Sequence, residues 1–500
     1  MKVLYVCAEL FPFLKTGGLA DVSAGLPPAL QALGCDVRLL LPGFPALMHA
    51  VTQRQVVATL PAGPAPWGQA PALPPVDVEK VRLPGLALPV YLLDSPGLYD
   101  RPGNPYLGPD GADWPDNAQR FAALGWSAAC LGQGLDTDWV PDVIHCHDWH
   151  AGLAPVYGCA FADARRNTPA TVFTVHNLAY QGLFEPSALA LLGLPATTLQ
   201  DSGLEFYGQL SFMKGAIEFA DQITTVSPTY AHEITTESQG CGLDGLLRVR
   251  ADCLSGVLNG VDYAIWSPAT DAWLAQTYDA QTLADKALAK QALQQRFGLA
   301  QRPDALVFGV VSRLSEQKGL HLLPQVLAEL VCRGGQLALL GQGDPALEQT
   351  FVDAAAAYPG QVAVCIGYDE ATAHTVVAGS DVILVPSAFE PCGLTQLYGL
   401  RYGTLPLVRR VGGLADTVVD CTLENLDDNT ATGFVFEALS AEGLLAAVKR
   451  AFVLYGQPHN WARVQERGMG LRFDWHTAAQ HYLALYQSLR PDASSFHSLH

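Results

Sequence analysis

The sequence predicts an α/β protein built from two doubly wound parallel sheets. Short apolar runs of strand length alternate with helix-length segments in both halves of the 500-residue chain. That length exceeds what one hydrophobic core normally organises, so two domains are expected. A short sequence, GGLAD, occurs at residues 17–21 and again at 412–416. The repeat suggests that each half offers a glycine-rich, helix-opening loop to one shared cleft.

The N-terminal segment is typical of a strand, a glycine-rich loop and a helix, followed by a second strand at residues 37–41. In the loop, the adjacent Gly17 and Gly18 let backbone N–H groups approach a ligand closely. The helix N-terminus favours an anion there, and Lys15 adds a positive charge. The loop is neither GxGxxG nor a P-loop, so a tight turn with a surface lysine is an equally good local interpretation.

The rest of the first half contains a helix, further strands and poorly patterned stretches. A helix is expected at about residues 117–133. Residues 58–84 are crowded with proline and alanine, which indicates an irregular loop or ribbon on the surface. The expected strands lie at residues 2–8, 140–147, 171–175 and 223–227.

Three histidines and an aspartate follow one another closely at the end of the strand at 140–147. His145, His147, Asp148 and His150 resemble a zinc motif, but Asp and Trp are transposed relative to HxHxDH. Alternating residues at a strand end point to opposite faces, and no second cluster supplies further ligands. We therefore expect no metal site. A polar rim, with Asp148 or its neighbours reaching the active cleft, is the favoured interpretation.

The second half repeats the alternation more regularly. The linker is placed near residues 259–268, which gives domains at 1–260 and 261–472. A C-terminal helix is expected at about 473–490, and the polar tail 491–500 is predicted to be disordered. The expected strands lie at 305–311, 336–340, 362–366, 381–385 and 405–408, and the helices at about 320–331, 345–357, 371–379 and 394–401.

A carboxylate and two cations occupy strand-to-helix loops of this second half. Glu390 lies between an apolar strand and a helix start, where open α/β sheets usually bind their ligands. Arg313 and Lys318 follow the first strand, and they could hold a diphosphate without metal. Tyr368 is placed to stack on a flat ring. Exposed charges and a core tyrosine are the alternatives for these residues.

Charge and cysteine content limit the class of protein and its partners. A formal net charge of −19 disfavours nucleic acid and anionic membranes, yet it suits a neutral polysaccharide. No run is long and apolar enough to span a bilayer, and the N-terminus lacks the features of a signal peptide. The eleven cysteines include no CxxC pair, and most lie in apolar surroundings such as residues 364–366. This pattern indicates reduced, buried thiols in a cytoplasmic protein.

Taken together, these motifs resemble the bacterial glycogen synthases and the related starch synthases, over nearly the whole chain. The resemblance implies a GT-B fold, with two facing Rossmann-like domains, a cleft between them and a C-terminal helix that crosses back to the first domain. It also implies metal-independent transfer of glucose from ADP-glucose to the non-reducing end of an α-1,4-glucan such as glycogen, with retention of configuration. No cofactor is expected. The motifs lie at residues 15–22, 147–150, 174–177, 258–262, 312–314, 317–319 and 390–395.

The resemblance also assigns roles by position. Glu390, His176, Arg313, Lys318 and Asp148 would form the catalytic set, in which His176 and Glu390 bind the glucose. The residues expected to contact the donor nucleotide are Lys15, Gly17, Gly18, Arg313, Lys318, Tyr368, Cys392, Gly393, Leu394 and Thr395. Those expected near the sugar or the acceptor are Asp21, Asn177 and Asn259, together with Asp148.

One departure and two alternatives bear on the mechanism. Many retaining GT-B enzymes have a second Glu eight residues after the first, where this chain has Tyr398. A front-face transfer in which Glu390 orients the sugar is therefore favoured over a covalent glucosyl intermediate. The alternatives are a transferase or phosphorylase using UDP-glucose or phosphate, and a glucan-binding protein without activity. A phosphorylase would need pyridoxal phosphate on a lysine, and no lysine has a context typical of that role.

Overall fold

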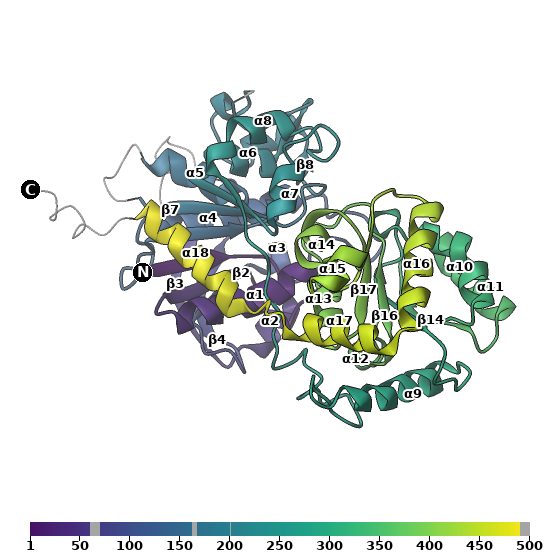
Figure 1. Cartoon of the computed structure of the whole chain (residues 1–500). Coiled ribbons are helices and arrows are strands. Elements are labelled where there is room, and N and C mark those ends of the chain that lie inside the picture. Colours follow the sequence, from purple (N-terminus) through teal and green to yellow (C-terminus); the bar gives the residue numbers. More distant parts are fainter. Residues whose placement is uncertain (61–70, 163–167, 201, 491–500) are drawn as a thin grey trace, which may run out of the picture. The chain divides into compact units, whose positions relative to one another are not determined.

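The computed structural model describes residues 1–60, 71–162, 168–200 and 202–490, which fold into two compact units (Figure 1). Unit 1 comprises Met1–Val226, Ala231–Gly260 and the chain from Trp475 onward. Unit 2 comprises Ser227–Tyr230 and Val261–Asp474. The predicted tail at 491–500 lies outside the described residues.

Unit 1 is built on a nine-stranded sheet with the order β12-β11-β7-β6-β1-β2-β5-β4-β3. The strands from β12 to β5 run parallel, and their runs of Val, Leu and Ile are buried. The bounds are β1 Lys2–Val6, β2 Asp36–Pro42, β3 Gln53–Leu60, β4 Val76–Arg82, β5 Val90–Asp94, β6 Val143–His147, β7 Ala170–Val175, β11 Gln222–Thr225 and β12 Leu254–Gly256. A separate three-stranded sheet contains β8 Leu183–Phe184, β10 Gln209–Ser211 and β9 Glu205–Phe206.

The antiparallel edge of this sheet corrects part of the interpretation of residues 58–84 as an irregular loop or ribbon. Residues 58–60 and 76–82 are strand, residues 71–75 have no regular structure, and residues 61–70 lie outside the described residues. β3 and β4 pair antiparallel, and β4 in turn pairs with β5. Val76, Val78 and Val81 of β4 are buried, so this strand contributes to the core. The apolar positions of β4 lie just after a proline-rich stretch, and the prolines masked their periodicity.

The helices of unit 1 include one contributed by the end of the chain. α18 lies beside α1, and Trp475 contacts Gly25 so closely that a Cβ there would lie 2.0 Å from the indole Nε1 (Figure 1). The bounds are α1 Gly18–Ala32, α2 Pro45–Ala50, α3 Pro96–Tyr99, α4 Asn117–Gly132, α5 Leu153–Ala162, α6 Phe212–Phe219, α8 Asp244–Val249 and α18 Trp475–Leu489. The short helix α7 Pro228–Glu233 is divided, with its first residues in unit 2.

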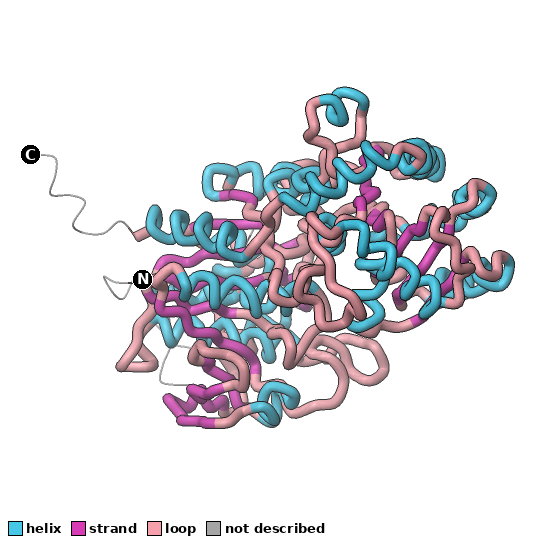
Figure 2. The backbone as a smooth tube through the Cα atoms, turned by 60° about the horizontal axis from the view of Figure 1, so that its bottom comes forward, coloured by secondary structure: helices cyan, strands magenta, loops and turns pink. Residues whose placement is uncertain are grey.

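Unit 2 is built on a six-stranded, wholly parallel sheet with the order β15-β14-β13-β16-β17-β18. Figure 2 draws the backbone with strands in magenta and helices in cyan. Successive residues of β13 enter different core clusters, Phe308 on one face and Val307 on the other, so both faces are buried. The strands are β13 Val307–Val311, β14 Gln336–Gly341, β15 Val362–Ile366, β16 Val382–Val385, β17 Leu405–Arg409 and β18 Phe434–Phe436. The helices are α9 Lys286–Phe297, α10 Leu323–Cys332, α11 Pro345–Ala357, α12 Glu370–Gly379, α13 Thr395–Arg401, α14 Gly412–Thr417, α15 Leu423–Asp427, α16 Ala441–Tyr455 and α17 Pro458–Gly470.

The doubly wound α/β class predicted from the sequence is confirmed in both units. None of the eleven cysteines, all of which lie among the described residues, forms a disulfide. The expectation of buried thiols is wrong for four of them, which are exposed: Cys159, Cys241, Cys332 and Cys365. Cys365 is exposed because β15 is an edge strand of its sheet. Among the described helices, none has both the length and the apolar character needed to cross a membrane.

Candidate active site

The predicted site residues of unit 1 lie at one edge of its sheet. Lys15 and the glycine loop follow β1, Asp148 follows β6, His176 follows β7 and Asn259 follows β12. These four strands are parallel, so their carboxyl ends meet at the same edge, where open α/β sheets bind ligands. The structure thus brings together residues that are widely separated in the sequence.

The glycine-rich loop of unit 1 is held by a residue that the sequence did not single out. Glu9 is 3% exposed, and its carboxylate accepts hydrogen bonds from the backbone N–H groups of Thr16 and Gly17. The hydroxyls of Thr16 and Tyr106 donate to the same carboxylate. Four donors replace the water lost on burial of this acid and fix the loop just before α1.

The tip of this loop is open. A Cβ added at Gly17 or Gly18 would meet no atom within 4 Å. Lys15 Nζ lies 2.9 Å from Asp21 Oδ1, and both side chains are partly exposed, at 31% and 22%. Backbone and cation are therefore accessible to an anion, with Asp21 as the present partner of the lysine.

Asp148 is a buried carboxyl with a strained backbone. It has a φ of 59°, and its side chain accepts hydrogen bonds from the N–H groups of Trp149, His176 and Asn177. Burial nevertheless raises the pKa of Asp148 to about 8. Its Oδ1 has no hydrogen-bond partner among the described residues. A buried polar atom without a partner, beside a strained backbone, is a common feature of functional sites.

His176 also sits in this environment, next to a second histidine. Its Nε2 lies 3.0 Å from Nδ1 of His147, and burial lowers the pKa of His176 to about 3. The imidazole is therefore neutral at physiological pH. The Asn177 side chain accepts the N–H of Ala179, and Asn259 is buried at 8% exposure.

The centre of unit 2 is Glu390, which follows β16. The carboxylate is 6% exposed, and its Oε2 accepts hydrogen bonds from Lys318 Nζ at 2.6 Å and from Ser387 Oγ at 2.9 Å. Lys318 in turn belongs to the loop after β13. Two predicted residues from different strand ends are thus in direct contact.

Backbone contacts hold the Glu390 loop from two sides. The N–H of Ala388 donates to the carbonyl of Gln317, and the Arg409 guanidinium donates to the carbonyl of Ala388. Gly319 adopts a φ of 65°, and a Cβ there would lie 1.9 Å from the Pro386 carbonyl oxygen. The loop carrying Lys318 can therefore approach the Glu390 loop only with glycine at this position.

The second GGLAD sequence closes the Glu390 loop from the other direction. The N–H of Gly413 donates to the carbonyl oxygen of Glu390 at 3.1 Å. A Cβ at Gly412 would lie 2.0 Å from the same oxygen, and one at Gly413 would lie 2.1 Å from the Cys392 carbonyl oxygen. This repeat packs against the main chain around Glu390.

The other predicted residues of unit 2 are placed as follows. Arg313 is exposed after β13 and has no ion-pair partner in the described part of the chain. Tyr368 follows β15 and is 53% exposed, so the core alternative for this tyrosine is wrong. Its hydroxyl donates to Glu370. The segment of Cys392, Gly393 and Leu394 leads from Glu390 into α13, which begins at Thr395.

The three histidines at the end of β6 and just after it have different surroundings. His145 and His147 lie on the same strand face with ring centroids 4.0 Å apart, whereas His150 stacks on Tyr106. Within the described ranges, no group of three His, Cys, Asp or Glu side chains is arranged to hold a metal ion. His150 lies beyond the strand, in the 3₁₀ turn at Trp149–Ala151, and so strand alternation does not set its direction.

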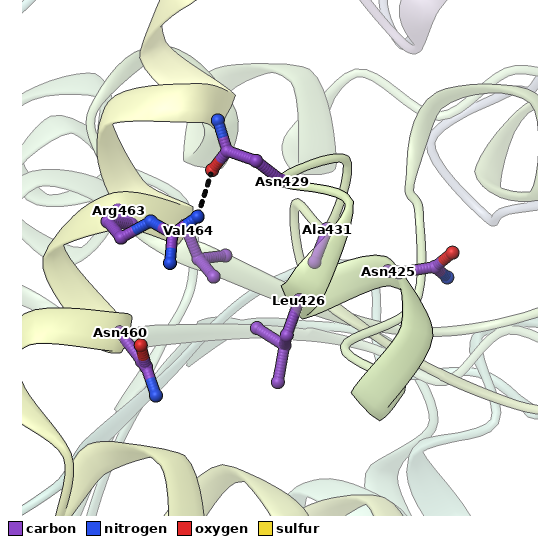
Figure 3. A pocket seen from close by; sticks show the side chains of 7 residues that line it. All are labelled: Asn425, Leu426, Asn429, Ala431, Asn460, Arg463 and Val464. Carbon is purple, nitrogen blue, oxygen red and sulfur yellow. Dashed lines mark hydrogen bonds between the residues drawn. The ribbon is translucent and has the colours of Figure 1, made fainter.

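A pocket elsewhere in unit 2 is lined by residues outside the predicted site (Figure 3). Arg463 donates to Asn429 across it at 3.3 Å. It lies between α15, the turn after it and α17, and it is lined by Asn425, Leu426, Asn429, Ala431, Asn460, Arg463 and Val464. None of these residues follows the carboxyl end of a strand near Glu390.

Comparisons with known proteins agree with this arrangement. The model of the starch synthase catalytic domain matches residues 2–249, and that of glycosyl transferases group 1 matches residues 292–466. The chain is 71% identical over 493 residues to the glycogen synthase of Albidiferax ferrireducens, covering 99% of this chain and 100% of that protein. This chain belongs to the glycogen synthase family.

Further members of the glycogen synthase family and a solved structure extend the comparison. The glycogen synthase of Francisella tularensis subsp. novicida is 53% identical over 98% of this chain and 99% of its own. The catalytic domain of starch synthase IV from Arabidopsis thaliana, bound to ADP and acarbose, matches with a TM-score of 0.85 at 32% identity, covering 97% of this chain and 99% of that one. The protein is a glycosyltransferase with the GT-B fold. A sucrose-phosphate synthase from Thermosynechococcus elongatus, at 16% identity and a TM-score of 0.57, shares the fold.

Proposed function

We propose that this glycosyltransferase moves glucose from ADP-glucose to the 4-hydroxyl at the non-reducing end of an α-1,4-glucan, retaining the α configuration and elongating glycogen in the cytoplasm. The observation that carries the proposal is the contact between Lys318 and Glu390, with Arg313 after the same strand, at the carboxyl edge of a doubly wound sheet. The related starch synthase whose structure contains ADP and acarbose supports an ADP-linked donor and a glucan acceptor for this chain.

The cations of unit 2 are suited to stabilise the leaving group. As the bond between glucose C1 and the phosphate oxygen breaks, negative charge develops on the ADP diphosphate. Arg313 offers a planar fork of donors and Lys318 a point charge, and neither needs a metal ion to neutralise that charge. Lys15, Gly17 and Gly18, together with the segment from Cys392 to Thr395, are proposed to contact the donor phosphates. Tyr368, exposed after an edge strand, is proposed to stack on the adenine.

The sugar is proposed to be held by neutral and anionic groups. Glu390 and the neutral His176 orient its hydroxyls, while Asp148, Asn177, Asn259 and Asp21 lie near the sugar or the acceptor. The acceptor 4-hydroxyl attacks C1 on the face from which ADP departs, and its proton passes to the departing phosphate oxygen. One C1–O bond forms as another breaks, and the acceptor proton ends on the departing phosphate. The reaction therefore balances without a cofactor.

The environment of Tyr398 supports this front-face route over a covalent glucosyl intermediate. Tyr398 occupies the position of a second carboxylate, and its ring stacks on Trp266 with centroids 3.9 Å apart and an interplanar angle of 4°. Glu390 is already engaged by Lys318 and Ser387, which suits orientation of a sugar better than nucleophilic attack. Trapping a covalent adduct on Glu390 would contradict this route.

The test is transfer of labelled glucose onto glycogen, with ADP-glucose and UDP-glucose compared side by side in the presence of EDTA. We expect strong incorporation from ADP-glucose, at least about 100-fold weaker in Lys318→Met, because removing one oxyanion-stabilising donor commonly costs 100- to 1,000-fold. Arg333→Gln is the matched control, since Arg333 pairs with Glu329 on a helix surface. Incorporation from UDP-glucose alone would overturn the donor assignment, and an absorbance band near 360 nm would indicate pyridoxal phosphate instead.

A further inference from the structure

The hydrogen bond between His147 and His176 restricts which ring nitrogen of His176 carries the proton. The side chain of His147 is fully buried on β6, beside Thr174 of β7 in the sheet register. Its Nδ1 lies 3.0 Å from His176 Nε2. Burial lowers the pKa of both imidazoles, so each is neutral and carries one N–H. One ring must therefore donate across this contact, and the other must accept.

The surroundings of His147 decide which ring donates. Its Nε2 is buried and has no hydrogen-bond partner among the described residues. A proton on Nε2 would create a buried N–H without an acceptor, and such orphan donors are rarer in proteins than orphan acceptors. The proton of His147 therefore belongs on Nδ1, which donates to His176 Nε2. The proton of His176 then belongs on its own Nδ1.

Aromatic packing keeps the His147 ring in the orientation that this bond needs. Tyr5 stacks on it with centroids 4.0 Å apart and an interplanar angle of 28°. The neighbouring ring of His145 is itself held in place, because its Nδ1 hydrogen-bonds the Tyr486 hydroxyl at 2.7 Å and its Nε2 hydrogen-bonds Thr174. Turning the His147 ring over would replace its nitrogen with a carbon at the contact, and it would have to do so inside this stack.

We propose that His147 is a positioning residue that donates from Nδ1 to His176 and thereby fixes His176 as the Nδ1–H tautomer, a neutral donor toward an oxygen of the transferred sugar. The proposal rests on the proposed function, in which His176 contacts the glucose. A neutral donor binds a hydroxyl oxygen without placing a cation beside the oxocarbenium-like transition state. Tautomer control by a second buried group is a known way to orient a functional histidine.

Two substitutions separate hydrogen bonding from packing. His147→Asn keeps a side-chain N–H near the position of Nδ1 but removes the stacked ring. His147→Phe keeps a ring against Tyr5 but removes the donor. We expect kcat for glucose transfer to fall about 10- to 100-fold in H147F, the range found when supporting partners are removed, and less than about threefold in H147N. The reverse order would show that His147 acts only through packing.

A double-mutant cycle tests whether the effect passes through His176. In a His176→Ala background, H147F should lower kcat no further, since the proton it controls is absent. Multiplied losses in the double variant would overturn the proposal. Melting temperatures of all variants identify any loss of fold.

A direct reading of the tautomer is independent of activity. The ¹⁵N chemical shifts of the labelled wild-type protein, assigned by the signals lost in H176A and H147F, should show His176 protonated at Nδ1. Protonation at Nε2 would overturn the inference even if glucose transfer is strong. An inactive wild-type protein with the Nδ1–H tautomer would instead contradict the proposed function and leave the tautomer assignment standing.

Discussion

The same five residues, GGLAD, have opposite surroundings in the two units. In unit 1 they open α1, and a Cβ on Gly17 or Gly18 would meet nothing within 4 Å. In unit 2 they open α14, and a Cβ on Gly412 or Gly413 would lie about 2 Å from a carbonyl oxygen of the Glu390 loop. The first copy leaves space that a ligand can enter, whereas the second fills it with the protein's own main chain. Identical sequence therefore borders open space in one unit and packs against the main chain in the other.

The two copies also differ in how they use a nearby acid. In unit 1, the side chain of Glu9 accepts the N–H groups of Thr16, just before the repeat, and of Gly17, its first residue. In unit 2, it is the backbone carbonyl of Glu390 that accepts the N–H of Gly413, which leaves the Glu390 side chain to Lys318 and Ser387. The carboxylate anchors the loop in the first case and is itself positioned by the loop in the second.

Gly413→Ala should have the largest effect. The added Cβ would lie 2.1 Å from the Cys392 carbonyl oxygen, so the Glu390 loop must move. We expect the free energy of unfolding to fall by about 1–3 kcal/mol, as overpacking commonly costs, and glucose transfer to fall by about 100-fold. Calorimetry and the transfer assay measure the two effects. An active variant of unchanged stability would remove the distinction between the copies.

Glu9→Gln should weaken the order of the first loop. An amide in place of the carboxylate brings N–H groups toward the donors of Thr16 and Gly17, and we expect a loss of about 1–3 kcal/mol in the free energy of unfolding. The KM for the donor should rise about tenfold, while that for glycogen stays the same. Tyr106→Phe, which removes a single donor to Glu9, is the matched control and should show a smaller change. A lower donor KM in E9Q would mean that the charge of Glu9 opposes the donor more than it orders the loop.

Gly18→Ala should leave the fold intact. The site is helical and open, so alanine should keep or raise stability by about 0.5–1 kcal/mol. If donor phosphates approach the backbone here, the added methyl group should raise the donor KM several-fold with kcat little changed. Steady-state kinetics in both substrates measures this. Unchanged donor kinetics would show that the open space is not a binding surface.

The aspartates that end the repeats should give the smallest effects. Asp416 accepts two hydrogen bonds from Thr229, at 2.9 and 2.7 Å, so Asp416→Asn should cost about 1 kcal/mol of stability. Asp21→Asn breaks a partly exposed pair with Lys15 and should change stability by less than about 0.5 kcal/mol. The freed lysine should lower the donor KM slightly. Equal melting temperatures for the two variants would contradict the assignment of Asp416 to packing.

The sequence predicted the elements with the simplest local signal. The parallel strands appear in the sequence as short apolar runs because both of their faces are buried, and β13 to β17 of unit 2 lie within one or two residues of expectation. The three-residue strand β18 was not predicted. β3 and β4 were missed because their alternating pattern borders a proline-rich stretch. Cys365 was misjudged because an apolar run does not reveal that its strand is at a sheet edge.

The supporting residues of the site were harder to predict than the residues they support. Glu9 is a single acid after a strand, and its role depends on Tyr106, distant in the sequence and in a segment without regular pattern. His147 was considered as a metal ligand and as part of a polar rim, but its contact with His176 was not predicted, because it depends on the pairing of β6 with β7. An acid directly after the first strand of a parallel sheet was the available signal for Glu9.

The placement of α18 in unit 1 has a consequence for biosynthesis. The strands of unit 1 emerge from the ribosome first, but the helix that covers α1 and brings Tyr486 to His145 is encoded after the whole of unit 2. The N-terminal unit must therefore remain unfinished, with an apolar helix surface exposed, until α18 has been synthesised. A chain released early, even one carrying every proposed site residue, would lack the helix that packs on α1 and bonds His145 beneath the site.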